Sequence, residues 1–251
     1  MVPTRLSIVT YNIWNTMRWG VREPALRQFV KLFNPDLLCL QELREETRAC
    51  LDEAMHDHAR VDDDLPGWTC EGNIYWNSKY FCEVEHGAED VGMLEEHRRM
   101  FWVRLEMTGQ DRTIFVSTAH FTYQGHPIER ETGQSPRIEQ TNRTIGVLQR
   151  LVRDDEPSFF MGDLNDPVHP TALLHAAGYT NCFSTLGIPP VPTHPCYPTT
   201  NIPVGARATQ QTIDWLYANA HARPIAAQVP HCFCGDVAPS DHWPVLGVYE
   251  V

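Results

Sequence analysis

Apolar runs of strand length alternate along the chain with amphipathic segments of helical length. The strand-like runs are residues 6–11, 36–42, 68–76, 80–84, 99–107, 113–120, 158–161 and 212–217, and a final strand follows 240–246. Helical spacing of apolar residues predicts helices over 23–34, 44–60 and 135–152 and a short one over 169–178. Residues 123–135 and the Pro-rich stretch 187–203 are predicted loops. No internal repeat or linker breaks this pattern, so we predict a single domain over residues 1–251.

The segment 158–166 combines a buried strand with polar groups that can handle water. Three apolar residues lead to Gly162, and Asp163 and Asn165 follow. Because residues two apart face the same side of a strand, both side chains are predicted to point into one cleft. An ionised Asp can take a proton from water, and an Asn can fix the direction of attack. The alternative is a strand that simply ends in an Asx turn.

Other predicted strands also end in polar side chains. Asn12, Glu42 and His120 each lie at a strand end, and Asp241 and His242 directly precede the last strand. Asp214 is different, because it lies inside an apolar run between Ile213 and Trp215. An unpaired buried carboxylate is costly, so Asp214 should have a partner such as a histidine.

Composition narrows the classes that the chain can belong to. A content of 42% hydrophobic and 21% charged residues among 251 is ordinary for a globular protein, and no apolar run approaches the ~20 residues that span a bilayer. The N-terminal residues lead into a strand without the layout of a secretory signal, so we expect a soluble, cytoplasmic protein. We also expect it to be a monomer. The eight cysteines include no Cys-x-x-Cys pair, and we expect them to be reduced.

The charge balance limits how a substrate can be held. The chain carries 32 acidic and 20 basic residues, a formal net charge of −12. This sign disfavours a broad surface that neutralises nucleic acid phosphates. A polyanionic substrate would have to be held locally, and a divalent cation is the best means.

Taken together, the polar blocks resemble those of the endonuclease/exonuclease/phosphatase (DNase I-like) superfamily. Six blocks occur in the family's order and span almost the whole chain: Thr10-Tyr11-Asn12, Gln41-Glu42, Thr118-Ala119-His120, Gly162-Asp163-Leu164-Asn165, Ile213-Asp214 and Ser240-Asp241-His242. The resemblance implies an α/β fold, a four-layer sandwich in which two mixed, mainly antiparallel sheets pack face to face with helices outside. It also implies Mg²⁺ or Mn²⁺ at an active site across the strand ends.

The resemblance implies a role for each matched residue. Glu42 and Asp241 would bind metal with Asn12 beside them, and Asp163 would activate the attacking water. Asn165 would orient the water or the phosphate, and His120 would lie on the leaving-group side. Asp214 would pair with His242 and aim that imidazole at a phosphoryl oxygen. Elementary electrostatics agrees with a bound cation, since two carboxylates about 4 Å apart repel by ~4 kcal/mol at an effective dielectric near 20.

Two assignments stay open at this point. In the DNase I-like branch an acidic residue supports the histidine that corresponds to His120, and Glu71, Glu83, Glu95 and Glu96 are all candidates for it. Arg137 is a candidate for binding the substrate phosphate, together with His120 and Asn165, and a solvated position on the surface is the alternative for Arg137.

The sequence therefore predicts a divalent-metal-dependent phosphoester hydrolase. A phosphodiesterase with nuclease-like chemistry is preferred, acting on a nucleic acid, a nucleotide or another phosphorylated small molecule or lipid. The alternative within enzymes is a lipid or inositol phosphate phosphoesterase, similar to sphingomyelinases or 5-phosphatases. The alternative from another class is a catalytically silent binding scaffold with the same fold, which the Pro-rich stretch would suit.

Overall fold

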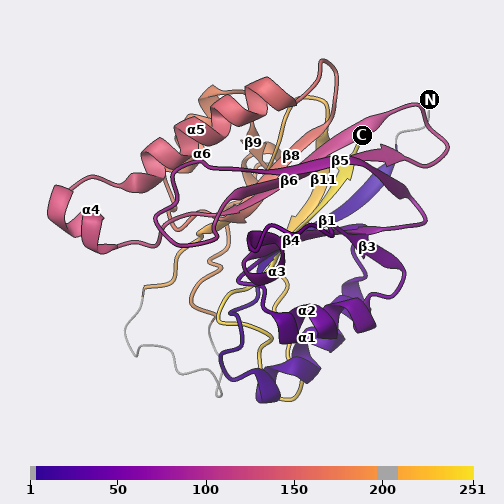
Figure 1. Cartoon of the computed structure of the whole chain (residues 1–251), viewed down its shortest axis with the longest axis horizontal. Coiled ribbons are helices and arrows are strands. Elements are labelled where there is room, and N and C mark those ends of the chain that lie inside the picture. The colour runs from indigo at the N-terminus through magenta and orange to yellow at the C-terminus, as the bar shows by residue number, and fades with distance from the viewer. Residues whose placement is uncertain (1–3, 197–208) are drawn as a thin grey trace.

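Two six-stranded sheets form the centre of the molecule, and helices cover their outer faces (Figure 1). The structure is a computed structural model that describes residues 4–196 and 209–251. In Figure 1, α1 and α2 lie below one sheet, and α5 and α6 lie above the other. The predicted four-layer sandwich is confirmed. The end of the predicted Pro-rich loop, residues 197–203, lies outside the described residues.

The first sheet has the strand order β11-β12-β1-β2-β4-β3. Its strands are β1 (Arg5–Asn12), β2 (Leu37–Gln41), β3 (His58–Arg60), β4 (Gly72–Asn77), β11 (Arg223–Gln228) and β12 (Val245–Glu250). β1 and β2 run parallel, and the other neighbours in the sheet are antiparallel. The parallel pair brings the carboxyl ends of β1 and β2 to the same edge of the sheet.

The second sheet has the order β5-β6-β7-β8-β10-β9. Its strands are β5 (Phe81–Glu89), β6 (Met100–Met107), β7 (Thr113–His120), β8 (Ser158–Asp163), β9 (Thr180–Asn181) and β10 (Asp214–Ala218). β6 and β7 form the predicted antiparallel hairpin, whereas β7 and β8 run parallel. Both sheets are thus mixed and mainly antiparallel, as predicted.

Alternate residues of the central strands supply two different cores. Ile8, Leu37 and Cys39 belong to the large hydrophobic cluster that also contains residues of the second sheet, such as Phe115 and Phe159. Their neighbours in β1 and β2 point the other way, because side chains alternate between the faces of a strand. Val9, Tyr11, Leu38 and Leu40 pack with Leu26 and Phe29 of α1 and Leu51 of α2. Burial on both faces explains why residues 37–40 form a continuous apolar run.

The helices agree only in part with the predicted ones. Their bounds are α1 (Trp19–Phe33), α2 (Glu45–Ala54), α3 (Gly67–Cys70), α4 (Pro127–Thr132), α5 (Pro136–Leu151), α6 (His169–Ala176) and α7 (Cys182–Leu186). The start predicted at Glu23 was wrong, because α1 begins at Trp19 and contains Pro24. The predicted start of α5 was right, and α4 occupies part of a stretch predicted to be loop.

Two predicted elements around β4 were wrong in length or type. The helix predicted over 44–60 ends at Ala54, and residues 58–60 form β3 instead. Pairing of β3 with β4 outweighs the helical spacing there, since tertiary contacts commonly override local propensity. The strand predicted over 68–76 begins as α3 and becomes β4 only at Gly72. Among the described residues, no helix has both the length and the apolar character needed to cross a membrane.

Gly162 allows the parallel strands β7 and β8 to approach each other closely just before they end at His120 and Asp163. It pairs with Ala119 in the register of β7 and β8, and its φ is 144°. A Cβ at this position would collide with the carbonyl oxygen of Ala119. Only glycine fits this conformation and this close backbone approach without strain. The residues that follow Ala119 and Gly162, His120 and Asp163, are thereby set side by side.

Candidate active site

The strand register gathers polar residues from both sheets at one end of the sandwich. In the first sheet, Asn12 pairs with Gln41, so Glu42 follows beside it. In the second sheet, Asp163 pairs with His120 on one side and with Asp214 on the other. All of these positions lie at the end of a strand or directly beyond one, where a side chain can leave the sheet. The predicted clustering of strand-end residues is therefore what the structure contains.

Asp163 is the centre of this cluster. Its carboxylate oxygen Oδ2 accepts a hydrogen bond from Asn12 Nδ2 at 3.0 Å, which links the two sheets. The same oxygen lies 3.4 Å from His120 Nε2 and 3.8 Å from His242 Nε2. Asp163 is only 1% exposed, so its charge is solvated by these neighbours rather than by bulk water.

His242 is held by the buried carboxylate that the sequence singled out. Its Nδ1 lies 2.9 Å from Asp214 Oδ2, and Asp214 is fully buried. Burial opposes protonation of His242, but the charges of Asp214 and Asp163 and the hydrogen bond to Asp214 raise its pKa well above the usual value. These neighbours therefore favour the protonated form of the imidazole, whose Nε2 faces Asp163.

His120 has an acidic partner of its own, and it is Glu71. His120 Nδ1 lies 3.0 Å from Glu71 Oε1, and Glu71 is the single residue between α3 and β4. Arg98 Nε also contacts this carboxylate at 3.1 Å. Burial raises the pKa of Glu71, but the hydrogen bond to His120 and the charges of His120 and Arg98 outweigh it and leave the pKa lowered. Of the four glutamates that the sequence left open, only Glu71 makes this contact among the described residues.

Glu42 is fixed from two sides by amides. Asn12 Nδ2 donates to its Oε1 at 3.2 Å, and Asn15 Nδ2 donates to its Oε2 at 2.7 Å. The backbone of Glu42 has a φ of 59°, a conformation that residues other than glycine seldom adopt. Strain of this kind persists where the surroundings fix it and is common at functional sites.

Asp241 lies on the segment before β12, next to a histidine that the sequence reasoning did not place in the site. His194 Nε2 is 3.9 Å from Asp241 Oδ2, and the centroid of the His194 ring lies 4.4 Å from that of the His242 ring, with the ring planes tilted by 34°. Burial raises the pKa of Asp241 to about 6, with Glu42 adding to the rise and His242 opposing it. Burial and the charge of His242 lower the pKa of His194 to about 4, so its imidazole is neutral.

The donor chemistry fits a hard divalent cation between the two sheets. The charge of Glu42 raises the pKa of the Asp241 carboxyl, and a cation relieves such repulsion between carboxylates. Within residues 4–196 and 209–251, two trios have ligand atoms within 4.8 Å of one another, namely His194 with Asp241 and His242, and Asp163 with Asp214 and His242. Both trios use His242, whose Nδ1 is already bonded to Asp214 Oδ2, and metal binding by the Glu42 and Asp241 carboxylates stays a prediction.

Asn12 and Asn165 both lie in the site, and their predicted roles stay predictions. The Asn12 amide nitrogen faces the carboxylates of Glu42 and Asp163, while its oxygen accepts from the Trp14 N–H, so metal binding by Asn12 stays a prediction. Asn165 lies beyond the end of β8 with a φ of 49°, and its N–H donates to Asp163 Oδ1 in an Asx turn. The strand alternation argument for Asn165 was wrong, because β8 ends at Asp163.

Arg137 is not the solvated surface residue that one interpretation described. It is 3% exposed and donates to the Thr122 carbonyl, pairs with Glu129, and has Nε 3.5 Å from Asp166 Oδ2. Substrate binding by Arg137 stays a prediction, and a phosphate would have to compete with these two carboxylates for the guanidinium.

Sequence reasoning also missed Arg22, whose guanidinium holds together two segments that carry site residues. This α1 residue is 1% exposed, and its guanidinium donates to the carbonyls of Ile13, Trp14 and Met17. It also donates to the carbonyl of Pro239, on the segment that carries Asp241. Arg22 thus joins the loop after β1 to the segment before β12. A long polar residue in a helix gives no sequence signal of such a role.

The fold and the site define a class of protein. Two mixed sheets packed face to face, with carboxylates, amides and paired histidines at one end, are the arrangement of a phosphoester hydrolase. The sequence matches the Endonuclease/Exonuclease/phosphatase family over residues 9–242, and the chain belongs to this family. Members of the family generally use a divalent metal ion, and the carboxylate cluster is in keeping with that.

Solved structures show the same fold at low identity. TDP2 from D. rerio, crystallised with a single strand DNA product, has a TM-score of 0.81 at 16% identity, with 99% of this chain and 100% of that chain covered. A mannosyl-6-phosphatase from Bacteroides thetaiotaomicron has a TM-score of 0.79 at 17% identity, with 98% and 99% covered. The comparison with curated proteins gave no match.

Proposed function

We propose that this chain is a phosphodiesterase with nuclease-like chemistry, in which water attacks phosphorus with the help of Mg²⁺ or Mn²⁺. One observation carries the proposal. Two histidines, each held by its own buried carboxylate, converge on Asp163 Oδ2 from His120 Nε2 at 3.4 Å and His242 Nε2 at 3.8 Å. A carboxylate base such as Asp163, with an imidazole on either side that can bear or accept a proton, suits the transfer of a phosphoryl group to water.

In this mechanism Asp163 accepts a proton from the attacking water. Asn12 donates to Asp163 Oδ2 and holds the carboxylate in place, while Asn165 orients the water or the phosphate from the adjoining turn. His242, kept cationic by Asp214, places a positive N–H beside a phosphoryl oxygen, where negative charge develops in the transition state. His120, oriented by Glu71, lies on the leaving-group side.

Glu42 and Asp241 would hold the divalent cation. When bound, such an ion polarises the phosphoryl group and stabilises the departing oxygen. The chain's own contribution is to fix these ligands, through Asn12 and Asn15 for Glu42 and through the Arg22 contact with Pro239 for the segment of Asp241. Oxygen ligands suit both Mg²⁺ and Mn²⁺.

The three arginines around the site are already engaged, and this favours a substrate with a single phosphate charge, such as a diester. Arg22 is engaged by backbone carbonyls, and Arg137 is engaged by Glu129 and Asp166. Arg98 is engaged by Glu71 and by the carbonyl of Phe121. A polyphosphorylated substrate needs several uncommitted cations, and these three arginines do not supply them.

Hydrolysis of bis(p-nitrophenyl) phosphate and of short oligonucleotides, with Mg²⁺ or Mn²⁺, tests the proposal. Asp163→Asn and His242→Ala should each lower kcat by about 10²–10⁴-fold, the range of general acid–base catalysis. EDTA should abolish the activity. Turnover that survives EDTA or either substitution would remove this mechanism. A panel with inositol phosphates and sphingomyelin liposomes in the same assay compares the diester with the alternative substrates.

A further inference from the structure

A cavity of about 400 Å³ opens directly beside the candidate active site. Asn165 and His194 form its inner wall, and Tyr123, Gln124, Gln211 and Ile213 are among the residues around it. The His194 ring contacts the ring of His242 in a tilted arrangement, and the Asn165 N–H donates to Asp163 Oδ1. A group that occupies this cavity would therefore lie next to a phosphate that reacts at Asp163. The volume lies within the range of ~300–1,000 Å³ that small-molecule sites have.

The chemistry of the wall selects the kind of group that fits. Among the described residues that line the cavity, none carries a carboxylate, an ammonium or a guanidinium. Besides His194, its polar groups are the hydroxyls of Tyr123 and Thr209 and the side-chain amides of Gln124, Asn165 and Gln211, and each amide can donate and accept. Among the described residues of the wall a second phosphate would find no arginine or lysine, and an acyl chain would leave the amides without partners, at a cost in free energy.

The polar wall is partly exposed, and its backbone is fixed next to His194. Gln124 Nε2 donates to Gln211 Oε1 across the cavity at 3.4 Å, a long contact that a ligand hydroxyl can replace. The backbone of Gln211 is bonded to that of His194 in both directions, with N···O distances of 2.7 and 3.0 Å. Tyr123 is 45% exposed and adds an aromatic ring at the rim. Paired amides with an aromatic ring suit a hydroxyl-bearing ring that also has an apolar face.

We propose that this cavity binds the sugar ring esterified to the reacting phosphate, with Gln124 and Gln211 as specificity-determining residues. The inference rests on the proposed function, because it assigns the cavity to the substrate of that same site. The sugar can belong to a nucleotide or be a free sugar phosphate, since the amides would recognise the hydroxyls of either.

Two substrates with the same leaving group isolate the contribution of the cavity. The p-nitrophenyl ester of thymidine 5′-phosphate carries a sugar, and methyl p-nitrophenyl phosphate does not. We expect wild-type protein to prefer the first, and Gln211→Ala to lower kcat/KM for the first by roughly tenfold, the value of one lost hydrogen bond to a ligand. The same variant should leave kcat/KM for the methyl ester unchanged. Gln124→Ala should behave like Gln211→Ala.

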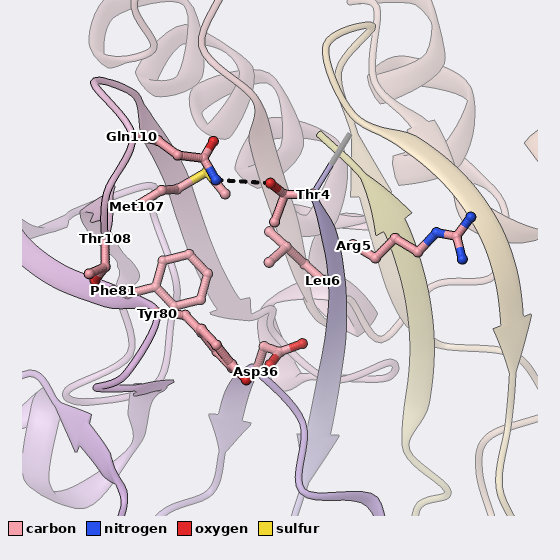
Figure 2. A pocket seen from close by; sticks show the side chains of 9 residues that line it. All are labelled: Thr4, Arg5, Leu6, Asp36, Tyr80, Phe81, Met107, Thr108 and Gln110. Atoms are coloured by element: carbon pink, nitrogen blue, oxygen red, sulfur yellow. Dashed lines mark hydrogen bonds between the residues drawn. The ribbon is translucent and has the colours of Figure 1, made fainter. Parts of the chain in front are cut away.

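A matched control comes from a different cavity, at the start of β1. Figure 2 shows Gln110 there, with its Nε2 donating to Thr4 Oγ1 at 2.9 Å. Asn12 lies at the opposite end of β1, roughly 25 Å from Thr4 along an extended strand. Gln110→Ala should therefore change neither ester's kcat/KM.

Three results would overturn the inference. They are no preference for the sugar-bearing ester, no change in Gln211→Ala, or an equal loss on both esters. Calorimetry of thymidine 5′-phosphate, glucose 6-phosphate and methyl phosphate provides a readout without turnover. If Gln211→Ala weakens binding of a sugar phosphate but not of methyl phosphate, the result supports the inference, and the sugar phosphate that is affected identifies the sugar's source. Equal weakening for all three ligands, or none, contradicts the inference. Absence of hydrolysis for every ester would contradict the proposed function instead.

Discussion

At the residue scale, the two histidines of the site depend on buried carboxylates that never reach the substrate. Asp214 holds His242, and Glu71 holds His120. An imidazole that is free to rotate would present the wrong nitrogen to Asp163 for part of the time. A carboxylate at Nδ1 fixes both the tautomer and the ring orientation. Each pair thus places a defined Nε2 next to Asp163.

Glu71→Gln tests the less expected of these pairs. Glutamine keeps the size of the side chain but removes the charge that orients His120, so we expect kcat to fall about 100-fold. KM should change little, because Glu71 does not line the cavity beside the site. Steady-state kinetics on bis(p-nitrophenyl) phosphate measures both quantities.

Glu95→Gln is the control for Glu71→Gln, because Glu95 contacts Arg98 and Thr122 rather than His120. Its kcat should remain near that of wild type. If the two variants lost activity equally, the His120–Glu71 pair would have no special role.

The sequence was sufficient to predict which polar residues lie at strand ends, but not which other side chains contact them. Asn12, Glu42, His120 and Asp163 follow apolar runs, and strand register then brings them together. Glu71 lies in a turn whose position depends on the α3 helix that the sequence did not reveal. Arg22 reaches the loop after β1 from helix α1, and His194 reaches the site from the segment between α7 and β10. Local patterns carry no information on such contacts.

At the scale of elements, the pairing of β7 with β8 decides whether His120 and Asp163 meet. This pairing requires glycine at position 162, where the φ is 144° and the Ala119 carbonyl leaves no room for a Cβ. Elements that pair with several neighbours, such as β8, were predicted well. The three-residue strand β3 and the short helices α3 and α4 were not, because so few residues give no measurable periodicity.

Gly162→Ala should destabilise the fold and separate the two catalytic strand ends. We expect a loss of about 3 kcal/mol or more in the free energy of unfolding, from backbone strain and the clash with Ala119. Urea unfolding measures this loss.

Gly146→Ala, in α5, is the matched control, because a Cβ there meets nothing within 4 Å. Alanine is the better helix former by about 1 kcal/mol, so this variant should be as stable as wild type or more stable. A neutral Gly162→Ala would contradict the close approach of β7 and β8.

At the scale of the whole molecule, a buried ion pair ties the second sheet together at a distance from the site. Arg104 of β6 contacts Glu156, just before β8, at 2.8 Å, and both residues are 4% exposed. Thr113 Oγ1 and the Arg153 N–H also donate to Glu156. Burial raises the pKa of Glu156, but these hydrogen bonds and the charge of Arg104 outweigh it and leave the pKa lowered.

Glu156→Gln should therefore lower stability in a pH-dependent way. A lowered pKa in the folded state means that Glu156 stabilises the fold above its unfolded pKa of about 4.3 and loses this contribution as pH falls through the folded pKa. Breaking the buried pair should cost about 3 kcal/mol at pH 7. The difference from wild type should shrink in acid, where Glu156 itself is protonated.

Urea unfolding at pH 7 and at pH 3 measures this difference. Glu139→Gln is the control, since its pair with Arg143 is exposed and such pairs contribute little. A stability difference for Glu156→Gln that is the same at both pH values would show that ionisation of Glu156 plays no part.

Hydrolysis of bis(p-nitrophenyl) phosphate in H₂¹⁸O, followed by mass spectrometry of both products, tests most directly whether Asp163 directs water to phosphorus. With Mg²⁺ or Mn²⁺ present, the account predicts that the label appears only in p-nitrophenyl phosphate and that Asp163→Asn yields almost none. Label in p-nitrophenol, or labelled product formed equally fast by Asp163→Asn, would contradict it.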